Sequence, residues 1–402
     1  MTELPLKKYY RWMFLPGVLL LLVPSILHAY FLMPFPGSQD IEAMNLSYYI
    51  EKFLWPTRIL ALALIALPIL NIYMNGRLKG RIWTSVLIVF MAGLLYFTEI
   101  FSSAEHMFLE PKQKTFASAS TNAVPLDRLI IGVSINGEAK AYPINFIGYH
   151  HKVQDSVGGK PILVTYCTMC RTGRVYDPFI DGKYQHFRLV GARHYDAIIE
   201  DNETGSWWYQ ATGTAAVGPR KGIAMGEIPC EQMTLGEWIS LHPNTLIMQP
   251  DPNFKARYKR LEPYDSYQPT KTDAASELLG WQRASWVIGV ISGNTAKAYR
   301  WNDVLPLHIV NDQIGTTPVV VMIGSDSTSF ACYKSTVAGE VLHLRADSLG
   351  KGYRDEHNDL WNVHGDCVEG ILQGKKLDRI PAYQEYWHAW HRFHPETAQW
   401  KS

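Results

Sequence analysis

The sequence predicts a membrane-anchored protein in which three N-terminal transmembrane α-helices are followed by two tandem β-rich (α+β) extracytoplasmic domains. Three observations lead to this fold class: three long apolar stretches near the N-terminus, basic residues on alternate sides of those stretches, and a segment that recurs further along the chain. The predicted parts are a membrane region over 1–103, a first domain over 104–248, a linker over 249–284 and a second domain over 285–402.

The composition excludes several classes of protein. A chain of 402 residues with 47% hydrophobic and 19% charged residues is too long for one ordinary domain and too apolar to be disordered. Its 38 basic and 37 acidic residues leave a net charge of +1, which offers no electrostatic footprint for nucleic acid. Five cysteines are too few for a disulfide scaffold. Since the chain also lacks a P-loop, we expect no nucleotide cofactor and no nucleic-acid partner.

The three apolar stretches are Met13–Met33, Phe53–Met74 and Ile82–Phe101. Each holds about twenty residues, which is enough to cross the hydrocarbon core of a bilayer. The first is longer than the apolar part of a signal peptide and no small-residue cleavage site follows it, so we expect it to be retained. Basic residues precede the first stretch and separate the second from the third: Lys7, Lys8, Arg11, Arg77, Lys79 and Arg81. The positive-inside rule therefore predicts an inner (cytoplasmic) membrane protein with a cytoplasmic N-terminus and periplasmic C-terminal domains.

Two charged residues interrupt the predicted spans. Arg58 lies early in the second span and Glu99 lies late in the third. Because these spans run in opposite directions, both charges are expected near the same interface, where they can pair or reach the lipid head groups. We favour such a structural pair over a proton pathway.

An internal repeat organises the remainder of the chain. The segment beginning at Ile131 aligns without a gap with the segment beginning at Ile288. Identical pairs include Gly132/Gly289, Tyr142/Tyr299, Asn145/Asn302, His151/His308, Asp155/Asp312, Trp238/Trp390 and Thr245/Thr397. Chance does not supply that many identities, so the sequence predicts two copies of one domain.

Each copy is expected to be rich in strands. An Asn-Gly pair between two apolar runs is typical of a tight hairpin, and a short continuous apolar run indicates a buried strand. In the first copy we expect a hairpin over 129–144 that turns at Asn136-Gly137, a short helix opened by Pro143 and closed by Asp155 and Gly158-Gly159, a buried strand over 161–166, a second hairpin at Asp181-Gly182, and a short helix over 235–243.

The two copies differ at one chemically significant place. The first copy follows its buried strand with Cys167 and Cys170, and the second copy has Gly324 and Ser327 at these positions. Residues that both copies share serve the fold, whereas residues in one copy alone are candidates for a site. The first copy is therefore predicted to be the functional one and the second a degenerate support.

The C-x-x-C pair allows three interpretations. A tight turn after a strand can point both sulfurs at one metal ion, with further ligands from His150, His151, His194 or Met169. Thiolate, thioether and imidazole groups suit copper at least as well as zinc, so copper is favoured. The pair could instead be catalytic in thiol-disulfide exchange, although the strand-like segment after it argues against a thioredoxin-like helix. Outside the cytoplasm it could also form a structural disulfide.

These interpretations lead to three hypotheses for function. The first is a membrane-anchored protein that binds a soft metal ion, in metal handling or redox assembly. The second is a non-enzymatic accessory subunit of a membrane complex, and the third is a thiol-disulfide oxidoreductase. The sequence assigns no catalytic residue, and it leaves open whether Cys230, Cys332 and Cys367 pair.

Four segments of the first copy resemble a known family. They are IGVSINGEAKAYP, YHHKVQDSVGGKPILVTYCTMCRTGRVYD, DNETGSWWYQATGTAAVGP and EWISLHPNT, and they are similar to the prokaryotic domain-of-unknown-function family 3179. The resemblance is close in the first copy and loose in the second, and it leaves out the spans and the linker. It places the family's histidine on His150 and its cysteines on Cys167 and Cys170, but Thr168 stands where proline is usual. The family implies no activity.

Overall fold

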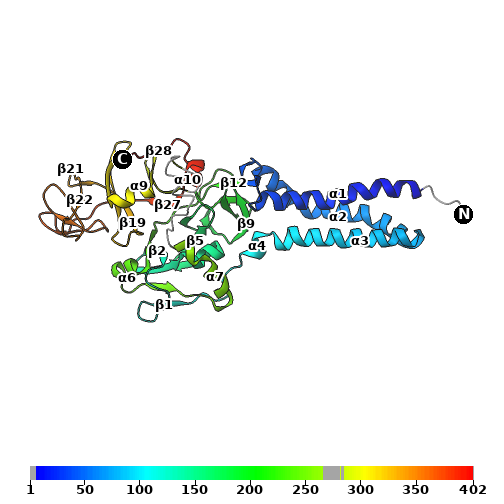
Figure 1. The fold of residues 1–402 in the computed structure, drawn as a ribbon, viewed down its shortest axis with the longest axis horizontal. Coiled ribbons are helices and arrows are strands. Elements are labelled where there is room, and N and C mark those ends of the chain that lie inside the picture. The colour runs from blue at the N-terminus through cyan, green and yellow to red at the C-terminus, as the bar shows by residue number, and fades with distance from the viewer. Residues whose placement is uncertain (1–5, 266–280, 282–284, 402) are drawn as a thin grey trace. The chain divides into compact units, whose positions relative to one another are not determined.

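The computed structural model describes residues 6–265, 281 and 285–401 (Figure 1). The described residues fall into two compact units. The first unit contains residues 6–109, Gln185–Tyr209 and Thr214–Ala224, and the second contains Glu110–Tyr184, Gln210–Gly213 and the described residues from 225 onward. The predicted boundaries follow the sequence repeat, whereas these units follow tertiary contacts.

The first unit contains the three predicted spans as helices. They are α1 (Leu6–Leu32), α2 (Met44–Asn75) and α3 (Leu78–Tyr96), which continues as the π-helix η2 (Phe97–Phe101). The segments Trp12–Leu32, Met44–Asn75 and Leu78–Phe101 are long and apolar enough to cross a membrane. The prediction of three such helices is confirmed, although the second begins at Met44 rather than at Phe53.

The two charges within these helices form an ion pair. The guanidinium of Arg58 pairs with the carboxylate of Glu99, and Arg58 Nη2 also donates to Ser25 Oγ at 3.1 Å. Glu99 lies in the π-helical turn, a geometry that re-aims side chains within a helix. The predicted pairing of these two residues is confirmed.

A small antiparallel sheet packs against the helices within the first unit. Its strand order is β12-β11-β10-β9, built from β9 (Phe187–Arg193), β10 (Asp196–Asp201), β11 (Trp207–Tyr209) and β12 (Ala215–Val217). Trp207 is fully buried in a cluster that includes Tyr48 of α2 and Leu32 of α1. A Cβ atom on Gly191 would lie 2.5 Å from Leu32 O, so only glycine permits this close approach.

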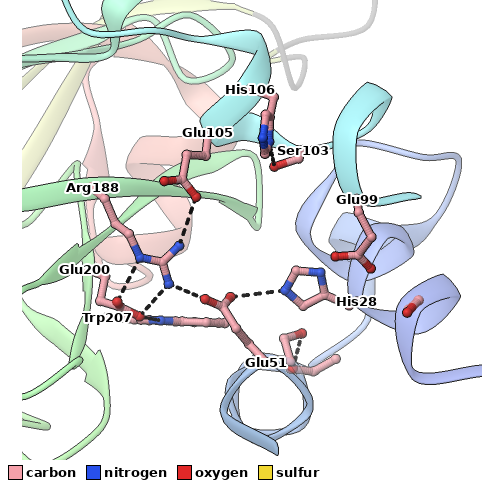
Figure 2. Close-up of polar contacts among 12 residues, drawn as sticks. His28, Glu51, Glu99, Ser103, Glu105, His106, Arg188, Glu200 and Trp207 are labelled. Carbon is pink, nitrogen blue, oxygen red and sulfur yellow. Dashed lines mark hydrogen bonds and ion pairs between the residues drawn. The ribbon is translucent and has the colours of Figure 1, made fainter. Parts of the chain in front are cut away.

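Charged residues also connect the helices with the sheet. Figure 2 shows Arg188 of β9 between Glu51 of α2 and Glu200 of β10. Arg188 Nε donates to Glu200 Oε1 at 2.8 Å, and the indole Nε1 of Trp207 donates to Glu200 Oε2 at 2.7 Å. The ring of His28 in α1 contacts the other side of Glu51, with 3.1 Å between Nε2 and Oε2. This chain of ion pairs fixes the sheet to the helix ends.

The second unit begins with most of the predicted first copy. A five-stranded sheet has the order β1-β14-β3-β2-β13, and a three-stranded sheet has the order β4-β5-β6. The elements are β1 (Phe116–Ser118), β2 (Leu129–Ile135), β3 (Glu138–Pro143), α5 (Ile144–His150), β4 (Lys152–Val157), β5 (Lys160–Cys167), β6 (Thr172–Tyr176), β7 (Phe179–Ile180), β8 (Lys183–Tyr184), β13 (Glu231–Thr234), α6 (Leu235–Leu241) and β14 (Leu246–Met248). Their apolar side chains form one core that includes Ile131, Tyr142 and Val164.

Most local predictions for this region are confirmed. Asn136 and Gly137 adopt φ values of 50° and 82°, as a tight hairpin turn requires, and Asp181 and Gly182 turn the second hairpin in the same way. The prediction that Asp155 closes the short helix is wrong. The helix ends at His150, and Asp155 lies in β4, which pairs along its length with β5.

The second unit continues with residues 285–401. The sheets have the orders β27-β15-β16-β28, β17-β18-β19-β26, β22-β23-β24-β25 and β20-β21. The elements are β15 (Trp286–Ser292), β16 (Thr295–Arg300), α9 (Trp301–Val304), β17 (Ile309–Ile314), β18 (Thr317–Ile323), β19 (Phe330–Lys334), β20 (Thr336–Val337), β21 (Glu340–Val341), β22 (Arg345–Ala346), β23 (Tyr353–Arg354), β24 (Leu360–Trp361), β25 (Cys367–Glu369), β26 (Arg379–Ile380), β27 (Ala382–Tyr386), α10 (Trp387–Phe393) and β28 (Ala398–Gln399). The prediction of a β-rich region after the helices is confirmed.

The predicted linker over 249–284 is only partly within the described residues. Its first part forms η3 (Pro252–Phe254), α7 (Lys255–Leu261) and η4 (Glu262–Asp265). Helix α7 packs on α5 through Tyr258, which is buried. Residues 266–280 and 282–284 lie outside the described part of the chain.

Candidate metal centre

The two cysteines of the C-x-x-C pair lie at a hairpin turn. Cys167 is the last residue of β5, and Cys170 lies in the turn that leads into β6. Strands β5 and β6 are antiparallel, with Cys167 opposite Thr172. The predicted strand–turn–strand setting is therefore confirmed, and it differs from a thiol at the N-terminus of a helix.

Backbone hydrogen bonds close this turn around the sulfur atoms. The N–H of Arg171 donates to Cys167 O at 2.8 Å, and the N–H of Cys170 points at Cys167 Sγ at 3.5 Å. Arg171 adopts a φ of 60°, which lets the chain reverse within four residues. Both cysteines are fully buried and neither is in a disulfide, and their Sγ atoms lie within 4.8 Å of each other. The turn thus places two sulfur donors side by side, out of contact with solvent.

A glutamine amide orients the second sulfur. Cys170 Sγ lies 3.8 Å from Gln210 Oε1. Gln210 is itself fully buried. Its Nε2 donates to Thr165 Oγ1 at 2.8 Å and to Thr172 O at 3.2 Å, and its backbone carbonyl accepts from Tyr176 OH at 2.7 Å. Such groups behind the donor atoms fix ligand orientation in metal sites.

Residues of the predicted second copy also hold the turn. The N–H of Tyr386 donates to Cys170 O at 2.8 Å. The guanidinium of Arg171 lies 3.9 Å from the centre of the Trp286 ring. The loop that carries both cysteines is therefore fixed from two sides, by its own strands and by residues from far along the chain.

The candidate donor set within the second unit consists of the two cysteine sulfurs. Both are fully buried. Thiolates are ligands that zinc accepts, and they also suit copper(I).

The adjacent histidines His150 and His151 follow each other at the end of α5, and the backbone carbonyl of His151 accepts a hydrogen bond from the N–H of Tyr166 in β5 at 3.0 Å. His150 ends α5, and its Nε2 lies 2.7 Å from the hydroxyl of Tyr258 in α7. His151 Nδ1 lies 3.3 Å from Tyr149 O, and burial lowers the pKa of His151 to about 4. Neither ring belongs to the group formed by the cysteines, and their predicted role as ligands stays a prediction.

The other two predicted ligands are also outside that group. His194 lies in the first unit, where its Nδ1 is 3.0 Å from Gln39 O and its Nε2 is 3.1 Å from Glu42 Oε2. Met169 lies in the turn between the two cysteines and is half-buried. These assignments likewise stay predictions.

The corresponding loop of the predicted second copy contains no sulfur. The carboxylate of Asp326 accepts hydrogen bonds from the N–H groups of Thr328 at 2.9 Å and Ser329 at 2.8 Å, and the N–H of Gly324 donates to Ser329 O at 2.8 Å. This loop is therefore a polar turn that supports itself. It offers no thiolate donor at the positions of the cysteine pair.

The remaining cysteines are free thiols in hydrophobic surroundings. Burial raises the pKa of Cys230 and of Cys332 to about 12, so both stay protonated at neutral pH. Cys367 is also buried and free. No disulfide is present among the described residues, which include all five cysteines.

Comparison with protein families identifies the chain. The model of a family described as "Protein of unknown function (DUF3179)" matches residues 110–397. The chain belongs to the DUF3179 family. The DUF3179 match includes the cysteine pair, the predicted linker and most of the predicted second copy, so it is broader than the resemblance found in the sequence. No curated protein and no solved structure matches the chain.

Proposed function

We propose that this DUF3179 protein is a membrane-anchored metal-binding protein that handles a thiophilic metal ion on the extracytoplasmic side of the membrane. Cys167 and Cys170 are the first two ligands. The observation that carries the proposal is the cysteine pair itself: two fully buried sulfurs within 4.8 Å of each other in a hydrogen-bonded turn, with no disulfide between them. A role in metal transfer or in redox assembly follows from this chemistry.

The ligand types limit the choice of metal. Two thiolates suit both copper(I) and zinc. The sequence favours copper because it suggests Met169 and His150 as further ligands. We propose copper or zinc as the ion.

The proposal includes an internal duplication, and several contacts that recur at aligned positions support it. A Cβ atom on Gly132 would lie 2.5 Å from the Trp238 ring, and one on Gly289 would lie 2.2 Å from the Trp390 ring. Each indole Nε1 donates to a threonine hydroxyl, in the pairs Trp238–Thr245 (2.8 Å) and Trp390–Thr397 (2.9 Å). Each aligned tyrosine hydroxyl donates to an aspartate carboxylate, in the pairs Tyr142–Asp155 (2.8 Å) and Tyr299–Asp312 (2.9 Å). The shared contacts support a duplication of one domain. The cysteine pair, present in the first copy alone, supports a functional role for the first copy and a supporting role for the second.

The experiment is elemental analysis of the full chain purified in detergent and loaded separately with zinc and copper(I). The test variant is Cys167→Ala with Cys170→Ala, and the matched control is Cys332→Ala with Cys367→Ala, which also removes two buried thiols. We expect near one ion per chain in the wild type and in the control, and almost none in the test variant.

Two results would overturn the proposal. One is a metal content that does not change in the test variant, and the other is a wild-type protein that binds neither ion after loading. A thiol count under native conditions runs beside the metal analysis, because a closed Cys167–Cys170 disulfide would favour the accessory-subunit or oxidoreductase hypothesis instead. His150→Gln tests the remaining predicted ligand in the same assay.

A further inference from the structure

The second unit contains a cavity that the proposed metal site does not use. Its volume is about 280 Å³, and it is formed by residues of the 123–128 segment, of α5 and of α7. Neither Cys167 nor Cys170 lines this cavity. Its lining therefore defines a second, independent place where a ligand can bind.

Positive charge dominates this cavity. Arg128, Lys255 and Lys259 line it, against the single acidic residue Glu262. Lys255 and Lys259 are one helical turn apart on α7, so they present both ammonium groups from the same face of the helix. Arg128 Nη1 donates to the backbone carbonyl of Glu262 at 3.3 Å. The lining carries three cations and one anion, and it is suited to an anionic ligand.

A buried amide points to a second feature of the ligand. Asn145, in the first turn of α5, lines the cavity and is 7% exposed. Its Oδ1 atom is buried and has no hydrogen-bond partner among the described residues. A buried acceptor without a donor is costly, and a ligand that brings a hydroxyl group removes this cost.

Aromatic and proline residues supply the apolar wall. The rings of Phe146 and Tyr258 lie 4.6 Å apart between their centroids, and both residues line the cavity with Pro125 and Pro250. The Tyr258 hydroxyl contacts His150 Nε2 at 2.7 Å. Tyr258 therefore contributes the apolar surface of its ring to the cavity. Convergent polar groups on an apolar wall are the usual composition of a small-molecule site.

We propose that this cavity binds a small hydroxylated organic oxyanion, whose carboxylate or phosphate is held by Lys255, Lys259 and Arg128 and whose hydroxyl donates to Asn145. The carbon skeleton of the ligand lies against Phe146 and the Tyr258 ring. A phosphate of this kind can come from a soluble metabolite or from a phospholipid head group, and the chemistry of recognition is the same for both.

The test is isothermal titration of the detergent-purified full chain with malate and with succinate, which differ only by one hydroxyl group. Lys255→Gln with Lys259→Gln removes two cavity charges, and Arg257→Gln with Arg260→Gln removes two charges from the same helix that do not line the cavity. We expect malate to bind to the wild type and to the arginine control equally, and about tenfold or more weakly to the lysine variant. Succinate should bind about fivefold more weakly than malate to the wild type.

Asn145→Ala should abolish the preference for malate over succinate. If Asn145→Ala does not fold, the affinities of the wild type for malate and for succinate still test the hydroxyl contact. Nanodiscs of phosphatidylglycerol and of phosphatidylcholine test the lipid source. Binding only to phosphatidylglycerol, weakened in the lysine variant alone, supports the oxyanion site with a head group as its ligand. The proposal is overturned if neither malate nor phosphatidylglycerol binds, if both double variants weaken binding equally, or if malate and succinate both bind with equal affinity.

Discussion

His151 shows how one residue type can serve the fold at a place where the sequence suggests a metal ligand. It follows α5 with a φ of 60°, and its N–H donates to Ile147 O at 2.7 Å, which closes the helix in a left-handed cap. His308, its aligned partner, adopts a φ of 57° at the end of a helical turn as well. The two aligned histidines therefore share a backbone role at the end of a helical turn.

Burial of His151 leads to a pH dependence of stability. Its folded-state pKa is about 4, below the unfolded value of about 6.5, so only the unfolded chain takes up this proton between those values. The free energy of unfolding should therefore fall as the pH drops from 6.5 towards 4, by up to about 1.4 kcal/mol per pH unit from this group. His151→Asn, which tolerates the left-handed backbone, should flatten this dependence in urea unfolding experiments.

The matched control is His186→Asn, at an exposed position in the first unit. It should keep the pH dependence of the wild type. An identical pH profile for the wild type and for His151→Asn would contradict the assignment of this acid sensitivity to His151.

At the scale of elements, the most informative contact joins β6 with β27. Arg174 of β6 and Glu385 of β27 are both buried, and Arg174 Nη2 donates to Glu385 Oε1 at 2.9 Å. The guanidinium also lies 3.2 Å from the centre of the Tyr383 ring. The next residue after Glu385 is Tyr386, whose N–H holds Cys170 O. The ion pair is therefore in a position to support the cysteine turn.

Removing one partner of this buried pair should be costly. Glu385→Gln leaves the Arg174 charge with only the half-exposed Glu227, whose Oε1 lies 3.5 Å from Arg174 Nη1. We expect a loss of about 3 kcal/mol in the free energy of unfolding, measured with urea, together with a lower metal content. Asp378→Asn, in the exposed pair with Lys334, is the control and should leave both quantities unchanged. Equal stability of the two variants would show that the buried pair does not support the fold.

At the scale of the whole molecule, contacts divide the chain differently from the sequence repeat. Residues 185–209 and 214–224 belong to the predicted first copy, yet they group with the helices. Within that unit, Arg193 is fully buried and donates to Phe31 O at 2.9 Å and to Ser38 O at 3.2 Å, in and just after α1. The membrane helices therefore have a folded β-sheet as their partner within one compact unit.

The orientation of the whole chain is a prediction that can be tested directly. Basic residues precede the first predicted span and separate the second from the third. The positive-inside rule therefore predicts that the N-terminus and the loop at Gly76 are cytoplasmic. Alkaline phosphatase, which is active only outside the cytoplasm, should be active when fused after Ser402 and inactive when fused after Gly76. Green fluorescent protein should give the opposite pattern, because it fluoresces in the cytoplasm. Activity of the phosphatase only in the Gly76 fusion would reverse the topology.

The sequence by itself determined the features that depend on neighbouring residues. Twenty-residue apolar runs specify spanning helices, and Asn136-Gly137 and Asp181-Gly182 specify tight turns, because only local backbone geometry and side-chain polarity are involved. The same local signals placed Cys167 and Cys170 in one turn. Asp155 was misassigned, because a short segment that alternates polar and apolar residues is ambiguous between helix and strand.

Tertiary structure alone decided which distant residues share a site. Tyr386 reaches the cysteine turn from far along the chain, and no motif links it with the cysteines. The oxyanion cavity likewise unites Asn145 of α5 with Lys255 of α7, a helix in the segment that the sequence predicts as a linker. Such groupings arise from the burial of apolar surface by whole elements, which brings polar side chains together irrespective of their spacing in the chain.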